Sequence, residues 1–200
     1  MALKNSLRMA MRRQAVGIDL SAQAVGLVVL SCGTRKMGQL RIECVASAPL
    51  AAGAMAGITL TTVDVEPHAA LRALRHAATF ELELHETYAG IWIGSDGVYG
   101  WRVEGESLAQ EIRYPSPEYS CVANALRDLA HDSSALVGGE IDLLEGVCFS
   151  LADIGDVLGC TVLPFDCSAL SDGEVIPYSE LPHEPGFAVA FGLALRGVAQ

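Results

Sequence analysis

The chain has 200 residues, of which 51% are hydrophobic, and its formal net charge at pH 7 is −11. A chain of this length and composition buries a substantial core, which excludes a wholly disordered protein and fits one large domain or two small subdomains. Residues 1–18 hold Lys4, Arg8, Arg12 and Arg13 without an acidic residue, so residues 19–200 carry −15. This acidic excess argues against nucleic-acid binding, which requires a basic surface.

The first residues form a basic leader in which Leu3, Leu7 and Met11 recur at helical spacing. Two interpretations stay open for it. An amphipathic helix would rest on an anionic membrane surface, whereas a helix of only about three turns is marginal in water and would fray. The leader lacks the uninterrupted apolar region of a secretory signal, and the apolar run at 25–30 is too short to span a bilayer. We therefore expect a cytoplasmic protein.

Three strands are predicted at the N-terminal end, over residues 16–20, 25–31 and 39–47, because apolar and polar residues alternate there. Sequential strands of this kind favour an antiparallel meander. Residues 49–57, rich in Ala and Gly, are expected to form a loop. Glu66 and Pro67 then open a helix that is predicted to reach residue 80, with Leu71, Leu74 and Ala78 on one face and Arg72, Arg75 and His76 elsewhere on its surface.

The central part of the chain predicts a β-hairpin. Strands at 88–93 and 98–103 flank the sequence Gly-Ser-Asp-Gly at 94–97, whose residues strongly favour a turn. A third strand at 109–114 and a helix at 118–131 are expected to follow.

The C-terminal part predicts a strand at 143–149, a helix at 151–158 and a strand at 160–165. An irregular proline-containing loop is expected over 171–185. Residues 187–198 are apolar on almost every side and predict a buried closing helix. The succession of elements indicates a mixed α/β (α+β) fold.

Motifs for hydrolytic or metal chemistry are missing from the sequence. The histidines show neither H-x-x-x-H nor H-E-x-x-H spacing, and there is no G-x-S-x-G, Walker A or G-x-G-x-x-G sequence. We therefore expect no catalytic residue and no metal site. The cysteines form no C-x-x-C pair and are expected to be buried free thiols in a reducing compartment; they are Cys32, Cys44, Cys121, Cys148, Cys160 and Cys167.

The opening hairpin is the candidate binding site that the residues themselves suggest. A tight turn between two strands can direct backbone N–H groups at a phosphate, while an aspartate at the end of the first strand holds Mg²⁺ through water. Asp19 has that position, and Ser21, Ala22 and Gln23 form the turn, without glycine or lysine. A plain structural hairpin and a degenerate phosphate loop for ATP and Mg²⁺ both remain open.

The sequence Gly-Ile-Asp-Leu-Ser at 17–21 and the following apolar strand resemble the first phosphate motif of the actin-like ATPase superfamily. More narrowly, they resemble the start of the PilM family of type IV pilus and competence assembly proteins, G-I-D-[IL]-G-S-x-x-[VI]-K. Asp19 matches the family aspartate, whereas Ser21 replaces its glycine and Gly26 its lysine. The sequence FAVAFGLALRG at 187–197 is very similar to the closing helix of the family.

The middle of the chain is similar to the family more loosely, in the hairpin at 90–101 and in the segment at 158–170. Asp153, Ile154 and Gly155 match the D-x-G of a second phosphate loop, but the Ser/Thr-rich turn that should follow is missing. A helix at 151–158 is the favoured prediction there.

The resemblance implies an actin-like (ribonuclease H-like) lobe with a small inserted subdomain and with the second lobe largely missing, since family members are much longer. The expected division is a basic leader at 1–14, a first part of the actin-like subdomain at 15–80, an inserted α+β subdomain at 81–135, and a return to the actin-like subdomain at 136–200.

The resemblance also implies a non-catalytic scaffold, cytoplasmic and peripheral to the inner membrane, of a type IV pilus, type II secretion-like or DNA-uptake machine. It would bind the cytosolic tail of a PilN-like inner-membrane protein, and a homo-oligomer is compatible with that role. Capture of an extended peptide needs a groove and no catalytic residue. The alternatives are a divergent actin-like ATP-binding protein or ATPase that uses Asp19 and the turn at 21–24, and an unrelated α/β domain.

Overall fold

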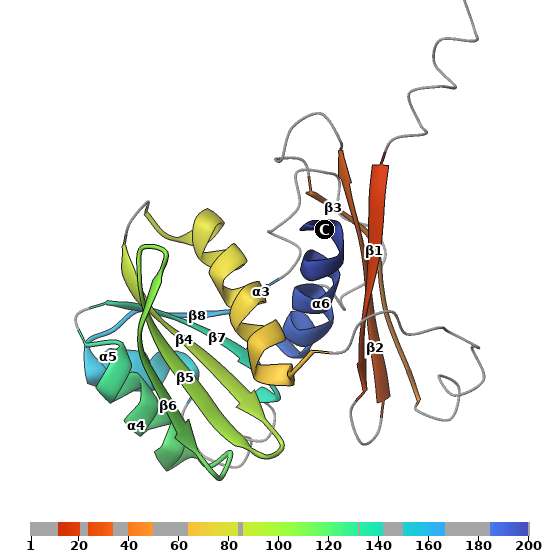
Figure 1. Cartoon of the computed structure of the whole chain (residues 1–200). Helices are drawn as coiled ribbons and strands as arrows, with labels where there is room; N and C mark the ends of the chain where they lie inside the picture. Colours follow the sequence, from red (N-terminus) through yellow and green to blue (C-terminus); the bar gives the residue numbers. More distant parts are fainter. Residues whose placement is uncertain are drawn as a thin grey trace, which may run out of the picture.

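A computed structural model describes residues 12–20, 24–33, 40–49, 64–83, 86–131, 133–141, 150–166 and 185–199. These residues form two β-sheets with helices between and beside them (Figure 1). The strands are β1 (Arg12–Leu20), β2 (Ala24–Gly33), β3 (Leu40–Pro49), β4 (Thr87–Gly94), β5 (Gly97–Glu104), β6 (Ser107–Tyr114), β7 (Ser134–Gly139) and β8 (Val162–Pro164). The helices are α3 (Glu66–Glu81), α4 (Tyr119–Leu129), α5 (Leu151–Leu158), the short 3₁₀ helix η5 (Pro185–Phe187) and α6 (Ala188–Ala199).

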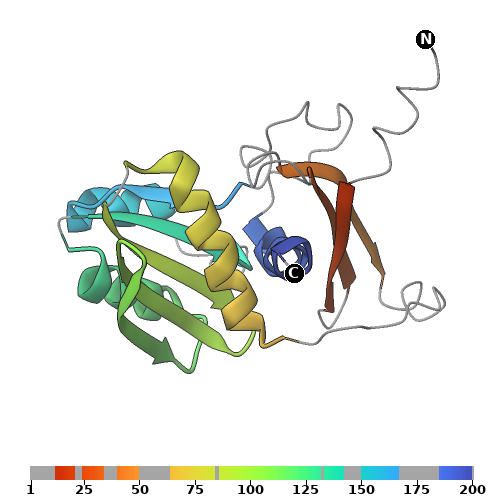
Figure 2. The same cartoon turned by 45° about the horizontal axis from the view of Figure 1, so that its top comes forward.

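The N-terminal sheet consists of β1, β2 and β3 in that order, all antiparallel, so the predicted meander is confirmed. Helix α6 packs against one face of this sheet, which we call its inner face (Figure 2). Gly17 permits the close approach, because a Cβ atom at that position would overlap the backbone carbonyl oxygen of Ala190. The closing helix is largely buried, as its uniformly apolar sequence predicted.

The central sheet has the strand order β6-β5-β4-β7-β8. Strands β4, β5 and β6 form an antiparallel meander, and β7 and β8 continue the sheet in the parallel direction. Strand β4 is buried on both faces. Ala89, Ile91 and Ile93 face α4 and α5, whereas Tyr88 and Trp92 face α3.

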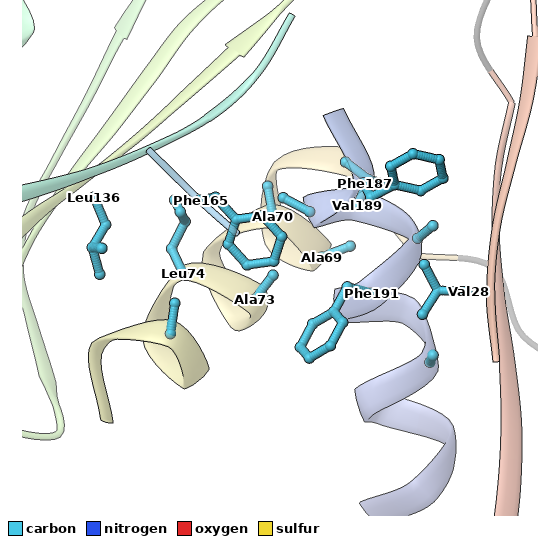
Figure 3. Packing of buried hydrophobic residues seen from close by; sticks show 14 of the residues in the cluster. Val28, Ala69, Ala70, Ala73, Leu74, Leu136, Phe165, Phe187, Val189 and Phe191 are labelled. Atoms are coloured by element: carbon cyan, nitrogen blue, oxygen red, sulfur yellow. The ribbon is translucent and has the colours of Figure 1, made fainter. Parts of the chain in front are cut away.

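Helices α3 and α6 join the two sheets through one hydrophobic core, which Figure 3 shows from close by. Alanines at 69, 70, 73 and 77 give α3 a small-residue face, so the two helices approach closely. Phe191 of α6 meets Phe165, which follows β8, edge to face with ring centroids 5.8 Å apart. Such aromatic pairs add about 0.5–1.5 kcal/mol beyond burial of their area.

Helix α5 settles the interpretation of the D-x-G sequence at 153–155. The hydroxyl of Ser150 accepts a hydrogen bond from the backbone N–H of Asp153, and the carboxylate of Asp153 accepts one from the N–H of Ser150. This reciprocal capping box is a helix start. The helix predicted at 151–158 is therefore confirmed, and Asp153 has a capping role.

Several predictions differ from the structure or lie outside its described part. Strand β7 was not predicted at all, and the boundary expected between residues 135 and 136 falls inside it. Residues 12–14, expected as the end of the leader, begin β1. The four described cysteines are free but partly exposed, not buried; they are Cys32, Cys44, Cys121 and Cys160. The loop expected at 49–57, the strand at 143–149 and the loop at 171–185 lie wholly or almost wholly outside the described residues.

Within the described ranges, no helix is long and apolar enough to cross a membrane.

Candidate functional site

Four carboxylates converge where the first hairpin of the N-terminal sheet meets the ends of β4 and β7. Asp19 stands near the end of β1, and Glu66 is the first residue of α3. Asp96 lies in the turn between β4 and β5, and Glu140 follows β7. Asp19 interacts electrostatically with Glu66 and Glu140, and Glu66 interacts with Asp96 and Glu140. We call these four residues the carboxylate site.

Asp19 has a strongly raised pKa. Burial raises the pKa of its carboxyl group, and the negative charges of Glu66 and Glu140 raise it further, to about 6. A hydrogen bond from the backbone of Leu20 opposes the shift without cancelling it. Asp19 is therefore close to half-protonated in mildly acidic solution and ionised at neutral pH.

Glu66 is held at the start of α3, where the positive end of the helix dipole favours a carboxylate. Its Oε1 accepts a hydrogen bond of 3.0 Å from the indole N–H of Trp92. Burial raises the pKa of Glu66, the Trp92 bond lowers it, and the charges of Asp96 and Glu140 raise it again, so that the net direction is upward.

Asp96 is anchored by β5 and β6. Its Oδ2 accepts a hydrogen bond of 2.6 Å from the hydroxyl of Tyr99 and forms an ion pair of 3.0 Å with Arg113. The guanidinium of Arg113 also lies over the Tyr99 ring, 4.9 Å from its centroid. Arg113 thus contacts both the carboxylate of Asp96 and the ring of Tyr99.

Glu140 is positioned by the backbone of the residue before it. Gly139 has φ of +108°, and a Cβ atom there would overlap the carbonyl oxygen of Ile93 in the neighbouring strand. That carbonyl accepts a hydrogen bond of 2.8 Å from the N–H of Glu140. A glycine is therefore required for β7 to end beside β4 with Glu140 at the site.

The composition of the site disfavours a bound polyphosphate. The chain has only two lysines, Lys4 and Lys36, and neither belongs to the described residues. Asp96 is paired with Arg113, but Asp19, Glu66 and Glu140 have no described cation between them and would repel a phosphate group that brings no cation with it. Within the described ranges, no group of three or more His, Cys, Asp or Glu side chains is arranged to hold a metal ion. The turn at 21–23, which would contact a nucleotide phosphate, lies outside the described residues.

Sequence reasoning identified only one of the four carboxylates. Asp19 was predicted and lies in the site, whereas its predicted partners Ser21, Ala22 and Gln23 lie outside the described residues. Glu66 and Asp96 had been interpreted only as a helix start and a turn. Glu140 was missed together with β7, although two glycines followed by a charged residue after an apolar run are a recognisable end-of-strand signal.

A separate cavity of about 420 Å³ opens between the C-terminal half of α3 and the hairpin of β5 and β6. Leu82, Ala78 and Tyr88 contribute apolar surface to its lining, and burial raises the pKa of Tyr88 to about 12. Charged and small residues complete its lining; they are Arg75, Thr79, Glu83, Glu86, Gly105 and Glu106. We call this the α3 cavity.

No protein-family model matches the chain, and no curated protein sequence matches it. Solved structures do match. A chain of the PilM–PilN type IV pilus biogenesis complex has a TM-score of 0.64 and 15% identity, over 92% of this chain and 98% of its own length.

Two further structures match across most of the chain. The activator of the 2-hydroxyisocaproyl-CoA dehydratase from Clostridium difficile, with bound ADPNP, has a TM-score of 0.55 and 10% identity, over 93% of this chain and 94% of its own. Component A of the (R)-2-hydroxyglutaryl-CoA dehydratase of Acidaminococcus fermentans has a TM-score of 0.53 and 11% identity, over 94% and 100%. These proteins share the actin-like ATPase fold, and the chain described above has the same mixed α/β, actin-like fold.

Proposed function

We propose that this chain is a non-catalytic cytoplasmic scaffold of a type IV pilus, type II secretion-like or DNA-uptake machine. In this role it binds the cytosolic tail of a PilN-like inner-membrane protein. The observation that carries the proposal is the actin-like fold that 92% of the chain shares with a chain of the PilM–PilN complex. The closing sequence at 187–197, which forms α6, adds the sequence resemblance described above.

The carboxylate site supports a role without nucleotide turnover. A phosphate brought beside Asp19 would meet the like charges of Glu66 and Glu140. The position at which the PilM pattern has a lysine is Gly26, which leaves no cation on that strand pair at the site. An ATPase relies on cationic groups to stabilise the transferring phosphoryl group.

The α3 cavity has the properties that capture of a tail peptide needs. Its apolar lining residues suit an apolar side chain of the peptide, and the excess of Glu83, Glu86 and Glu106 over the single cation Arg75 suits a basic one. Cytosolic segments next to a transmembrane helix carry an excess of Lys and Arg. Such a segment complements an acidic protein in charge as well as in shape.

A titration with the cytosolic tail tests this proposal. A fluorescently labelled synthetic peptide with the sequence of the cytosolic tail of a PilN-like protein should bind with a saturable change in anisotropy. Glu106→Lys should weaken the complex about fivefold or more, because it reverses a charge at the cavity. Glu111→Lys, on the exposed strand β6, makes the same charge change away from the cavity and serves as the control. Absence of binding at high micromolar concentration would refute the proposal.

A second candidate function is nucleotide binding, which the partly buried Asp19 at the end of β1 favours. Isothermal titration with ATP and Mg²⁺ separates the two candidates. On the scaffold proposal no heat of binding is expected. Heat that is present in the wild type and disappears in Asp19→Ala would instead assign the hairpin to a nucleotide.

A further inference from the structure

Strand β1 forms an open edge of the N-terminal sheet (Figure 1). Its nine residues pair with β2 without a break, and no described strand pairs with its other side. In the central sheet, the first strand of the meander, β4, is closed on that side by β7. An edge strand exposes a row of backbone N–H and C=O groups that can pair with another chain.

The other three edge strands of the two sheets have features that hinder such pairing. The register of β3 with β2 shifts after Val29, and β3 ends in Pro49. The register of β6 with β5 shifts after Arg102, and β8 has only three residues, the last of which is Pro164. Strand β1 contains neither a register shift nor a proline. Among the described strands, β1 is therefore the edge best suited to pair with another strand.

Two charged side chains lie symmetrically on β1. Arg13 and Asp19 each stand three residues from Val16, the centre of the strand. Both share the inner face of the sheet with Gly17, which lies against α6, because alternate residues of a strand point to the same side. Arg13 is exposed and has no acidic partner among the described residues, whereas Asp19 interacts with two like charges of the carboxylate site. Within the described part of the chain, each of the two thus lacks an opposite charge.

Antiparallel pairing of β1 with β1 of a second copy would match these charges. A two-fold axis at Val16 pairs residue 12 with residue 20 of the second copy, 13 with 19, 14 with 18 and 15 with 17, so that the whole strand is paired. Arg13 then faces Asp19 of the second copy, and the symmetry repeats this contact. Directly opposite side chains in such a pair have Cβ atoms about 4.5–5.5 Å apart, which permits an ion pair.

Other registers of this pairing are less favourable. Moving the axis to residue 15 places Arg13 opposite Gly17, and moving it to residue 17 places Asp19 opposite Ala15. Both moves also leave two residues at one end of each strand unpaired. The register with the longest pairing is therefore the one that joins opposite charges. A second copy of the chain carries the complementary charge at the required position, whereas an unrelated strand would have to match it independently.

We propose that β1 pairs in the antiparallel direction with β1 of a second copy of this chain, through reciprocal contacts of Arg13 with Asp19. The side chain of Val16, 53% exposed in the single chain, meets its own copy at the axis on the opposite face of the sheet. Because β1 has a single open edge, the assembly closes as a dimer. The pairing uses neither the α3 cavity nor a membrane-protein tail, so it goes beyond the proposed function and does not depend on it.

Light scattering of the whole purified chain, over a series of concentrations at low salt, tests the proposal. The wild type should form a dimer. Arg13→Glu and Asp19→Lys should each weaken it about tenfold or more, because each puts like charges opposite one another at both contacts. An equimolar mixture of the two variants should dimerise again, since both contacts then join opposite charges. The two substitutions combined in one chain should restore the dimer for the same reason.

Charge reversals elsewhere provide matched controls. Glu111→Lys on the edge strand β6 and Arg127→Glu on α4 both change exposed residues and should dimerise like the wild type. Circular dichroism should show that every variant is folded. Cross-linking checks the axis, with the wild type and its own cysteines as the baseline. Val16→Cys should form a disulfide with its copy much faster than Gln14→Cys, whose copies lie about 14 Å apart along the strands.

Several results would overturn the proposal. A wild type that stays monomeric at high micromolar concentration would do so, and so would a dimer that both single variants leave intact. A mixture of the two variants that remains monomeric, or equal cross-linking at positions 14 and 16, would exclude the antiparallel register centred on Val16. A chain that is monomeric alone and uses β1 only to bind another protein would also overturn it.

Discussion

Gly192 of α6 lies directly against the backbone carbonyl oxygen of Ala69 in α3, so closely that a Cβ atom at position 192 would overlap that oxygen. Because α6 packs on the N-terminal sheet and α3 on the central sheet, this contact fixes how near the two sheets come. Arg72 reinforces it with a hydrogen bond of 2.8 Å to the carbonyl oxygen of Gly192.

Replacing Gly192 by Ala should therefore destabilise the protein. Alanine favours a helix by up to about 1 kcal/mol over glycine, but here the helices must move apart to accept its methyl group. We expect a loss of about 1–3 kcal/mol in the free energy of unfolding, as for overpacked cores. Urea denaturation measures it. Gly186→Ala is the control, since a Cβ there meets no atom within 4 Å and should change stability by less than about 0.5 kcal/mol. Equal stability of the two variants would contradict the helix contact.

Asp64 links the same two helices from the side. Its Oδ2 forms ion pairs with the guanidinium groups of Arg72 in α3, at 2.8 Å, and of Arg196 in α6, at 2.9 Å. The side chain of Asp64 is only 9% exposed. Burial alone would raise the pKa of Asp64, but the bonds from both arginines and the N–H of Val65 lower it below its ordinary value.

Replacing Asp64 by Asn should lower the free energy of unfolding at pH 7 by about 1–3 kcal/mol, because the two arginines lose the negative charge that accepts their hydrogen bonds, and the neutral amide oxygen replaces it only in part. The deficit should shrink as the pH falls below about 4, since a carboxyl with a lowered pKa contributes stability only while it is ionised. Urea denaturation at both pH values checks this. Glu104→Gln removes the exposed pair with Arg102 and should cost less than about 1 kcal/mol. A cost for Asp64→Asn that stays constant down to pH 3 would exclude this explanation.

The elements that the sequence predicted correctly are those with local signals. The N-terminal meander follows from alternation of apolar and polar residues, the hairpin of β4 and β5 from its Gly-Ser-Asp-Gly turn, and α3 from Glu66 and Pro67 at its start. Strand β7 was missed because its six residues, SALVGG, end in two glycines, which weaken a strand. Its place beside β4 depends on pairing between distant parts of the chain, which no local pattern encodes.

The carboxylate site could likewise be predicted only in part from local sequence patterns. Asp19 could be found because it belongs to a motif at the end of a strand. Glu66, Asp96 and Glu140 each have a local explanation, as a helix start, a turn and a strand end. Only the packing of α3 and of the central sheet against the first hairpin brings the four together, and that arrangement depends on tertiary contacts.

The mutual repulsion in this site can be measured directly. Glu66→Gln keeps an oxygen that can accept the Trp92 hydrogen bond but removes a charge that raises the pKa of Asp19. The pKa of Asp19 should fall from about 6, yet stay above its ordinary value because burial persists. Carbon-13 NMR of labelled aspartate carboxyl groups follows the titration. Glu104→Gln, outside the site, should leave it unchanged, and an unchanged titration in Glu66→Gln would show that the two carboxylates do not interact.

The raised pKa of Asp19 also makes stability depend on pH. A carboxyl group whose pKa rises from 3.8 to about 6 on folding favours the folded state while it is protonated, and this contribution is lost as the pH climbs through 6. The full shift corresponds to about 3 kcal/mol, which partial hydration of the carboxylate and relaxation of its neighbours should reduce to about 1–2 kcal/mol. Asn cannot ionise, so Asp19→Asn should gain stability over the wild type by that amount between pH 4 and pH 7.5. Urea denaturation of both proteins at the two pH values gives this difference. A gain that is the same at pH 4 and pH 7.5 would mean that Asp19 titrates alike in the folded and unfolded chain, and the carboxylate site would then have no energetic cost.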